Sequence, residues 1–273
     1  MDDVNLVFNF IGVSVVDWPA AFHFFGEKLR LRAGLEPKHG DWAVLGGAWD
    51  AYYKNGIHSA VFELFDQGRP VPDRRWGVNQ GFRPGFHVSN LKRTVETIRT
   101  RNGISIGEIK EQPWGKTAEF STTEGIRFAF AEIPNTPNSD DLSVPYIGHV
   151  AVKCADLKRM EDFYGSLLRF TPLHASTDTP IFTQADGHPW IILEPGGSAS
   201  TFELRDTIWE NNAVRAFPVF ISLMTTDIQT VYRHLKARDV VILRDILSHE
   251  DWGGTDFHIA DPDGNGIQIV QYG

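Results

Sequence analysis

The sequence predicts an α+β protein built from four similar units that form two domains. Four short apolar runs each end in Asp or Asn and lead into an amphipathic helical segment. The Asp and Asn residues, spaced about 70 residues apart, are Asp17, Asn90, Asp156 and Asp227. Both types are favoured helix N-caps because their side-chain oxygens accept first-turn N–H groups. Each unit is therefore predicted to be a strand, a helix and then further strands.

The strand that opens each unit is the apolar run directly before the cap. The four predicted opening strands are Val7–Val15, Gly85–Val88, Tyr146–Val152 and Val219–Met224. Each following helix has an apolar stripe at helical spacing, and Pro19 stands in the first turn, where its missing N–H costs nothing. The later strands in the first and third units are predicted at Trp42–Leu45, Ala60–Phe65, Ile181–Thr183 and Trp190–Leu193.

The second and fourth units share a longer match, which divides the chain into two halves. Trp114–Thr117 corresponds to Trp252–Thr255, and Gly125–Arg127 corresponds to Gly266–Gln268. Between the halves, Pro134–Pro145 is rich in Pro, Ser, Asn and Asp, which is typical of a linker. We therefore expect domains at residues 1–133 and 146–273, joined by a linker at 134–145.

Composition excludes several classes of protein. No apolar run approaches the roughly 18 residues of a membrane span, and the start of the chain has no signal-peptide pattern. A single cysteine, Cys154, rules out an intrachain disulfide and favours the cytoplasm; we expect it to be a small core residue. The net charge of −9, without a basic run, argues against nucleic acid and anionic membranes as partners.

Three segments carry a family resemblance: Tyr146–Asp156 (YIGHVAVKCAD), Phe163–Leu168 (FYGSLL) and Asp261–Gln268 (DPDGNGIQ). They resemble the vicinal oxygen chelate superfamily, which includes glyoxalase I, the extradiol ring-cleaving dioxygenases and the bleomycin-resistance proteins. The resemblance spans nearly the whole chain. It implies four βαβββ modules paired into two open-barrel domains, each around a central cavity. Because one scaffold hosts many activities, the fold does not fix the reaction.

In this family, metal ligands come from the first strand of a module, seven residues before the helix cap, and from its last strand. The four first-strand positions hold Phe10, Arg83, His149 and Phe220. On the last strands, Gln268 stands where the family usually has Glu, and the third unit offers Glu194. The intact triad of two His and one carboxylate that a non-haem iron dioxygenase needs is not seen. The resemblance implies at most an atypical or incomplete site for Fe, Mn, Zn or Ni at His149, Gln268 and Glu194.

The first unit offers Glu63, within a sequence (Val-Phe-Glu-Leu-Phe) that resembles a ligand strand of the family. Arg83 and Arg127 occupy the ligand positions of the second unit, and two guanidiniums would repel a cation. We therefore expect Glu63 to form a buried ion pair with Arg83 or Arg127. The N-terminal domain is then a candidate for a degenerate domain that serves only as a structural partner of the C-terminal domain.

Two histidines near the C-terminus are the candidate catalytic residues. His249 and His258 resemble, by their distance from Gln268, the acid–base groups that line the cavity of extradiol dioxygenases. Neutral imidazole can ligate a metal and can transfer protons near neutral pH. We expect His258 and Gln268 to converge with His149 on one cavity. The alternative is that these side chains are satisfied inside the barrel by hydrogen bonds within the protein.

Three aromatic residues, Phe220, Trp252 and Trp190, are predicted to line an apolar pocket for a small molecule; the alternative is that they fill the core. Two hypotheses for function remain open. In the first, the chain is a metal-dependent lyase, isomerase or dioxygenase-like enzyme acting on a small oxygenated or aromatic substrate in the C-terminal barrel. In the second, it is a metal-free protein that sequesters a small molecule, as bleomycin-resistance proteins do. Neither hypothesis decides between a monomer and a homodimer.

Overall fold

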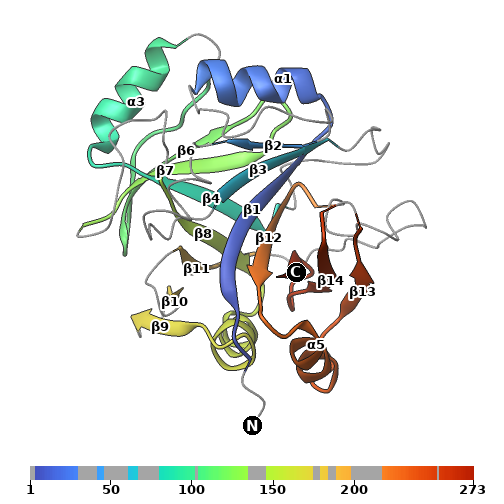
Figure 1. The fold of residues 1–273 in the computed structure, drawn as a ribbon. Helices are drawn as coiled ribbons and strands as arrows, with labels where there is room; N and C mark the ends of the chain where they lie inside the picture. Colours follow the sequence, from blue (N-terminus) through green and yellow to red (C-terminus); the bar gives the residue numbers. More distant parts are fainter. Residues whose placement is uncertain are drawn as a thin grey trace.

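The structure, a computed structural model, describes residues 4–29, 42–45, 61–66, 80–101, 104–134, 146–174, 179–183, 189–197, 217–250 and 252–273. Two curled β-sheets occupy its centre, and helices cover them at opposite ends (Figure 1). Among the described residues, no helix is long and apolar enough to cross a membrane. The predicted α+β class is confirmed.

Four units follow one another along the chain. Unit 1 contains β1 (Val7–Val15), α1 (Trp18–Phe22), the π-helical η1 (His23–Lys28), β2 (Trp42–Leu45) and β3 (Val61–Asp66). Unit 2 contains β4 (Phe82–His87), α3 (Leu91–Thr100), β5 (Lys110–Gln112), β6 (Gly115–Ser121) and β7 (Arg127–Glu132). Unit 3 contains β8 (Tyr146–Cys154), α4 (Leu157–Glu161), the π-helical η2 (Asp162–Leu167), β9 (Thr171–His174), β10 (Ile181–Thr183) and β11 (Trp190–Pro195). Unit 4 contains β12 (Val219–Met224), α5 (Ile228–Lys236), β13 (Ile242–Ser248), β14 (Gly254–Ala260) and β15 (Gly266–Tyr272).

All four predicted N-caps are confirmed. Each cap side chain accepts a hydrogen bond of 2.9–3.0 Å from the backbone N–H three residues further on. The pairs are Asp17 with Ala20, Asn90 with Arg93, Asp156 with Arg159, and Asp227 with Thr230. The repeat that is visible in the sequence is therefore a repeat of helix starts in the structure.

Each sheet joins one unit from the first half of the chain to one unit from the second half. Sheet I has seven strands in the order β13-β14-β15-β12-β1-β3-β2, and it combines units 1 and 4. Sheet II has eight strands in the order β5-β6-β7-β4-β8-β11-β10-β9, and it combines units 2 and 3. Antiparallel pairing of β1 with β12 and of β4 with β8 makes these joins. Two half-barrels form as predicted, but each one takes one unit from each half of the chain.

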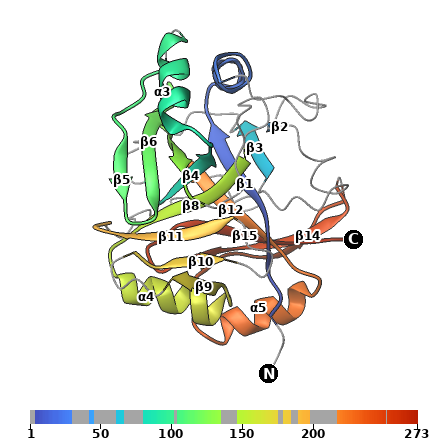
Figure 2. The same ribbon diagram turned by 90° about the vertical axis from the view of Figure 1, so that its left-hand side faces the viewer.

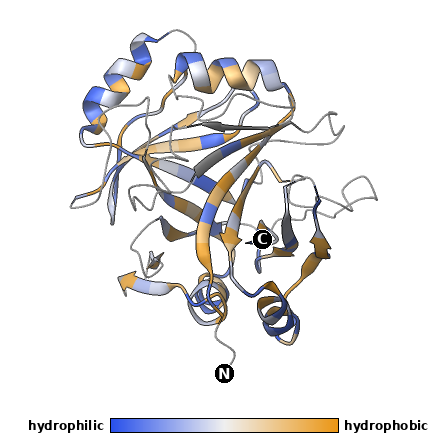
Figure 3. Ribbon diagram, viewed as in Figure 1, coloured by the Kyte–Doolittle hydropathy of each residue, from blue (hydrophilic) through white to orange (hydrophobic). Residues whose placement is uncertain are grey.

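Units 1 and 2, which lie in different sheets, contact each other through side-chain packing. Phe24 and Phe25 of unit 1 contact Phe120 and Phe128 of unit 2, with ring centroids 6.5 and 5.5 Å apart. The helices follow the same grouping: α1 and α3 lie on one side of the sheets, and α4 and α5 on the other (Figures 1 and 2). Their outward faces are mostly hydrophilic, as on α3 and α5 (Figure 3). The domain boundaries at 1–133 and 146–273 stay a prediction, since linker residues 135–145 lie outside the described part.

Within each half of the chain, a carboxylate from the second unit accepts hydrogen bonds from the first unit. This carboxylate lies in the turn before β7 in the first half and before β15 in the second half. In the first half, Glu124 accepts hydrogen bonds from the backbone N–H groups of Val16, at 3.1 Å, and Asp17, at 2.8 Å. In the second half, Asp263 accepts one from Ala155 at 2.7 Å. Both carboxylates therefore satisfy N–H groups at the strand-to-helix junction of the preceding unit.

Replacing Glu124 with Ala tests this fastening. The two N–H groups of Val16 and Asp17 lose their acceptor, so we expect the free energy of unfolding to fall by about 1–2 kcal/mol in urea denaturation. Glu108→Ala is the matched control, because Glu108 is 89% exposed and only meets Arg99 at 3.4 Å. That change is expected to stay within about 0.5 kcal/mol. Equal effects of the two substitutions would contradict the assignment.

Candidate functional site

A row of side chains crosses five neighbouring strands on one face of sheet I. Residues that pair across neighbouring strands point to the same face of a sheet, and so do residues two apart on one strand. The row consists of Phe10 on β1, Ser222 on β12, Gln268 on β15, His258 on β14 and Arg244 on β13. Asp256, two residues before His258, lies on the same face. Apart from Phe10 of unit 1, the row therefore consists of polar side chains from the strands of unit 4.

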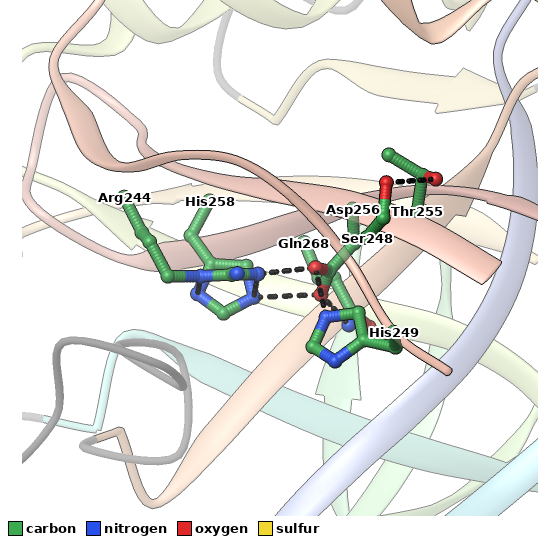
Figure 4. Close-up of polar contacts among 7 residues, drawn as sticks. All are labelled: Arg244, Ser248, His249, Thr255, Asp256, His258 and Gln268. Carbon is green, nitrogen blue, oxygen red and sulfur yellow. Dashed lines mark hydrogen bonds and ion pairs between the residues drawn. The ribbon is translucent and has the colours of Figure 1, made fainter. Parts of the chain in front are cut away.

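The carboxylate of Asp256 is the centre of this group and accepts from four donors (Figure 4). Arg244 Nη2 forms a buried ion pair with Oδ1, and His249 Nε2 lies 2.7 Å from the same oxygen. His258 Nε2 lies 3.0 Å from Oδ2, and Gln268 Nε2 donates to Oδ2 at 2.6 Å. Asp256 is only 2% exposed. We call these five residues the Asp256 cluster.

The surroundings fix the protonation states of two members of the cluster. Burial alone would raise the pKa of Asp256, but the hydrogen bond and charge of His258, together with Arg244, hold that pKa well below its usual range. Burial lowers the pKa of His258 to about 4, against the smaller opposing effect of its bond to Asp256. His258 is thus neutral at pH 7, with a proton on Nε2 facing Asp256 and Nδ1 accepting from Arg244 Nε at 3.3 Å.

His249 lies at the rim of the cluster. Its side chain is 19% exposed, whereas His258 is fully buried. Its ring stacks on Trp252 with centroids 4.7 Å apart, and Trp252 in turn meets the ring of Tyr272 edge-on. Among the described residues, the second ring nitrogen, Nδ1, has no hydrogen-bond partner. Of the two predicted catalytic histidines, only His249 can therefore meet a substrate directly.

Two buried atoms of the cluster have no hydrogen-bond partner among the residues that the structure describes. They are Gln268 Oε1, an acceptor, and Arg244 Nη1, a donor. Buried polar groups are normally paired, so unpaired ones at a concave face are candidates for ligand contact. Nearby, Asn9 Nδ2 lies 3.3 Å from Ser222 Oγ and 2.9 Å from Tyr272 Oη, which ties β1 to β12 and β15.

Aromatic rings cover the adjoining part of the same face. Phe220 lies against Phe10 and Phe65, with centroids 6.0 and 5.5 Å away. A Cβ at Gly12 would overlap the Phe220 ring, so only glycine fits beside it. Phe220 is 2% exposed and is part of the core beside the cluster, while Trp252 is 40% exposed at the rim.

The remaining predicted residues lie on sheet II. His149 Nδ1 lies 3.0 Å from His87 Nε2, and the Trp190 ring meets His87 edge-on. Glu194 forms an ion pair of 2.6 Å with Arg83. His149, Glu194 and Trp190 therefore share one face with one another, but not with the Asp256 cluster.

Two expectations from the sequence need correction. His149 and Glu194 do not converge with Gln268 and His258, because β8 and β11 belong to sheet II whereas β14 and β15 belong to sheet I. The expected pairing of Glu63 with Arg83 is not seen either, while the alternative pairing with Arg127 stays a prediction. Glu63 lies on β3 of sheet I, and Arg83 instead pairs with Glu194 and, at 3.1 Å, with Glu119. Both errors have one cause, the pairing of unit 1 with unit 4 and of unit 2 with unit 3.

The residues at the family's ligand positions do not fit a divalent cation. On sheet I these positions hold Phe10, Phe220, Gln268 and Glu63, of which only Glu63 carries a carboxylate, and the neighbouring carboxylate of Asp256 already pairs with Arg244. On sheet II, burial lowers the pKa of His149, and the neighbouring His87 and Arg83 lower it further. No group of three His, Cys, Asp or Glu side chains suitable for a metal occurs among the described residues. A cation would meet guanidiniums on both faces.

The sequence analysis did not single out Arg244 or Asp256. A signal for each was present: Asp256 stands two residues before His258 on a predicted strand, which places both on one face. Arg244 interrupts the apolar run Val240–Leu247, where a charge requires a buried partner. The pairing of the two could not be predicted, because it depends on the register of β13 against β14.

Comparisons with known proteins agree with this fold. A family model described as the Glyoxalase/Bleomycin resistance protein/Dioxygenase superfamily matches residues 146–269. A comparison with curated proteins finds no significant match.

Solved structures resemble the chain over nearly its whole length. Glyoxalase I from Zea mays superposes with a TM-score of 0.65 at 16% identity, covering 98% of this chain and 92% of the maize chain. A point mutant of the same maize protein gives 0.67 at 15% identity, covering 97% and 94%. A Bacillus subtilis protein named only provisionally as a dioxygenase gives 0.63 at 9% identity, covering 97% and 84%. At these identities the likeness establishes the fold alone.

The lowered pKa of His258 predicts a pH dependence of stability. In the unfolded chain a histidine binds a proton near pH 6.5, whereas folded His258 does so only near pH 4. The contribution of neutral His258 to the free energy of unfolding is therefore complete above pH 6.5 and is lost as the pH falls toward 4. This contribution is about 3 kcal/mol. Burial raises the pKa of Asp261 to about 6. Protonation of Asp261 therefore increases the free energy of unfolding as the pH falls below 6, which opposes the effect of His258 in part of this range. Urea denaturation from pH 7 to 4.5 should therefore show a shallower fall in stability for His258→Asn than for the unaltered chain. Parallel curves would contradict the account.

Proposed function

We propose that the Asp256 cluster binds a small oxygenated or aromatic substrate and that His249 transfers a proton within it. The cluster lies within residues 146–269, which match the model of the Glyoxalase/Bleomycin resistance protein/Dioxygenase superfamily. One observation carries the proposal: the Asp256 carboxylate holds His249 through Nε2, and the other ring nitrogen remains available at the rim. This is the arrangement in which a carboxylate orients an imidazole as a general base. The reaction class is that of an isomerase or lyase.

The proton balance involves only groups of this chain. Asp256 stays ionised and keeps the Nε2 proton of His249, so that the Nδ1 lone pair of neutral His249 accepts a proton from carbon or oxygen of the substrate. The imidazolium that forms is stabilised by the same carboxylate and returns the proton to another atom of the substrate. His258, fully buried and neutral, is a positioning residue that holds Asp256 in place.

Substrate oxygens would meet the unpartnered atoms of the cluster. Arg244 Nη1 can donate to a carbonyl oxygen that gains negative charge, and Gln268 Oε1 can accept from a hydroxyl. The exposed Trp252 ring gives an aromatic surface at the rim, beside His249. This set suits a small substrate with neighbouring carbonyl and hydroxyl groups or with an aromatic ring.

The proposal includes that this chemistry needs no divalent metal. Phe10 and Phe220 supply no donor atoms, and the Arg244 guanidinium stands where a cation would have to share Asp256. A metal bound through His149 or Glu194 would lie on the other sheet and could not serve His249.

A second candidate is metal-free sequestration of an aromatic compound. The observation that favours it is the aromatic group of Phe10, Phe65 and Phe220 beside the cluster. The two candidates differ in one property, since sequestration requires no proton transfer and thus no intact His249.

Deuterium exchange tests the proposal without knowledge of the natural substrate. Chelator-treated protein with hydroxyacetone or phenylacetaldehyde in D₂O should exchange the protons next to the carbonyl, as followed by ¹H NMR. We expect His249→Ala to lower this exchange at least about 100-fold, because that residue is the base.

His23→Ala is the matched control, since His23 is a 54% exposed histidine paired only with Glu27, and its exchange should stay unchanged. Exchange that depends on added metal, or that survives His249→Ala, would contradict the proposal. Binding of these compounds without any exchange would favour sequestration.

A further inference from the structure

We propose that sheet II carries a second, separate binding site for an uncharged small molecule with a carbonyl oxygen. The site is the face that carries Arg83, Trp114 and His149, which the proposed function does not use. It requires neither a metal nor the Asp256 cluster.

Three buried side chains on this face each have a nitrogen without a partner. These atoms are Arg83 Nε, Trp114 Nε1 and His149 Nε2, judged against the residues that the structure describes. The residues are 7%, 8% and 0% exposed, so water does not replace the missing partners freely. Arg83 Nε and Trp114 Nε1 can only donate, and they therefore require an acceptor. Three such groups together are unusual in a folded protein.

The three residues point to one region. His149 pairs with Gly85 across β8 and β4, and a Cβ at Gly85 would overlap the His149 ring. Arg83, two residues before Gly85, is on the same face, and its charge acts on His149. The Trp114 ring meets the His149 ring edge-on, with centroids 4.9 Å apart. The missing acceptor can thus be supplied by one ligand.

The charges on this face favour an uncharged ligand. Arg83 lies between two carboxylates, 3.1 Å from Glu119 and 2.6 Å from Glu194, so its charge is more than neutralised. Burial, His87 and Arg83 lower the pKa of His149 well below its usual value, and the ring is neutral. An anion would be repelled by Glu119 and Glu194, and a cation could not supply the lone pair that the unpaired N–H groups require. A carbonyl oxygen supplies an acceptor without net charge.

Apolar side chains lie beside the donors. Small and medium side chains form a separate cluster with Trp114, to which Trp190 adds one ring: Ala131, Ile133, Ala151, Ile181 and Ile192. Apolar walls with a few directed polar groups are typical of small-molecule sites. The proposed ligand is therefore a neutral carbonyl compound of which the remainder is apolar.

Indole signals in ¹H–¹⁵N spectra of the full-length chain give a direct test. The chain has eight Trp residues, and Trp114→Phe identifies the Trp114 indole signal. Three probes of similar size are compared: acetophenone with a neutral carbonyl, toluene without an acceptor, and benzoate with a charge. Acetophenone should shift the Trp114 signal saturably, whereas toluene and benzoate at equal concentration should not.

Trp114→Phe also tests affinity, since Phe keeps a ring and loses only the N–H donor. Equilibrium dialysis should show acetophenone binding weakened about three- to tenfold by this change. Trp18→Phe, on α1 where Trp18 packs against Phe22, should leave the affinity unchanged. An unshifted Trp114 signal at the solubility limit of acetophenone would overturn the proposal, as would an equal shift with toluene. An equal shift with benzoate would overturn the assignment to uncharged ligands.

Discussion

The buried carboxylate of Asp256 is the interaction on which the candidate site depends. A buried charge is tolerated only with partners, and Asp256 takes them from Arg244, His249, His258 and Gln268. These donors come from β13, β14, β15 and the loop between β13 and β14, so one side chain fixes their relative positions. The same contacts explain why Gln stands at 268: a Glu there would remove a donor and add a second negative charge beside Asp256.

The two sheets carry charged groups of opposite arrangement on equivalent faces. On sheet I, one carboxylate is surrounded by donors, and one donor (Arg244 Nη1) and one acceptor (Gln268 Oε1) have no partner among the described residues. On sheet II, one guanidinium, that of Arg83, is held by Glu119 and Glu194, and only nitrogen atoms are left over. A guanidinium within each group takes the place that a cation would need. One scaffold thus carries two faces with different unpartnered polar atoms and, among the described residues, no group of three His, Cys, Asp or Glu side chains that could hold a metal.

Local features were predictable from the sequence, whereas the grouping of units was not. The four N-caps and the opening strands β1 and β12 follow from patterns within a few residues, and they were predicted correctly. The joining of β1 to β12 and of β4 to β8 depends on contacts between residues far apart in the chain. Because of these two strand pairings, His149 and Gln268 lie in different sheets, and so do Glu63 and Arg83. His249 and His258 were predicted as a pair, but their difference in exposure required the structure.

The most direct measurement is a pH titration of the Asp256 carboxyl group by ¹³C NMR, with Asp256→Asn used for assignment. Four donors on this carboxylate predict a pKa well below the usual range, so its chemical shift should stay that of an ionised group down to about pH 3. Titration at or above the ordinary pKa of an aspartate would contradict the account, because the four donors would then not stabilise the ionised carboxylate against the cost of its burial.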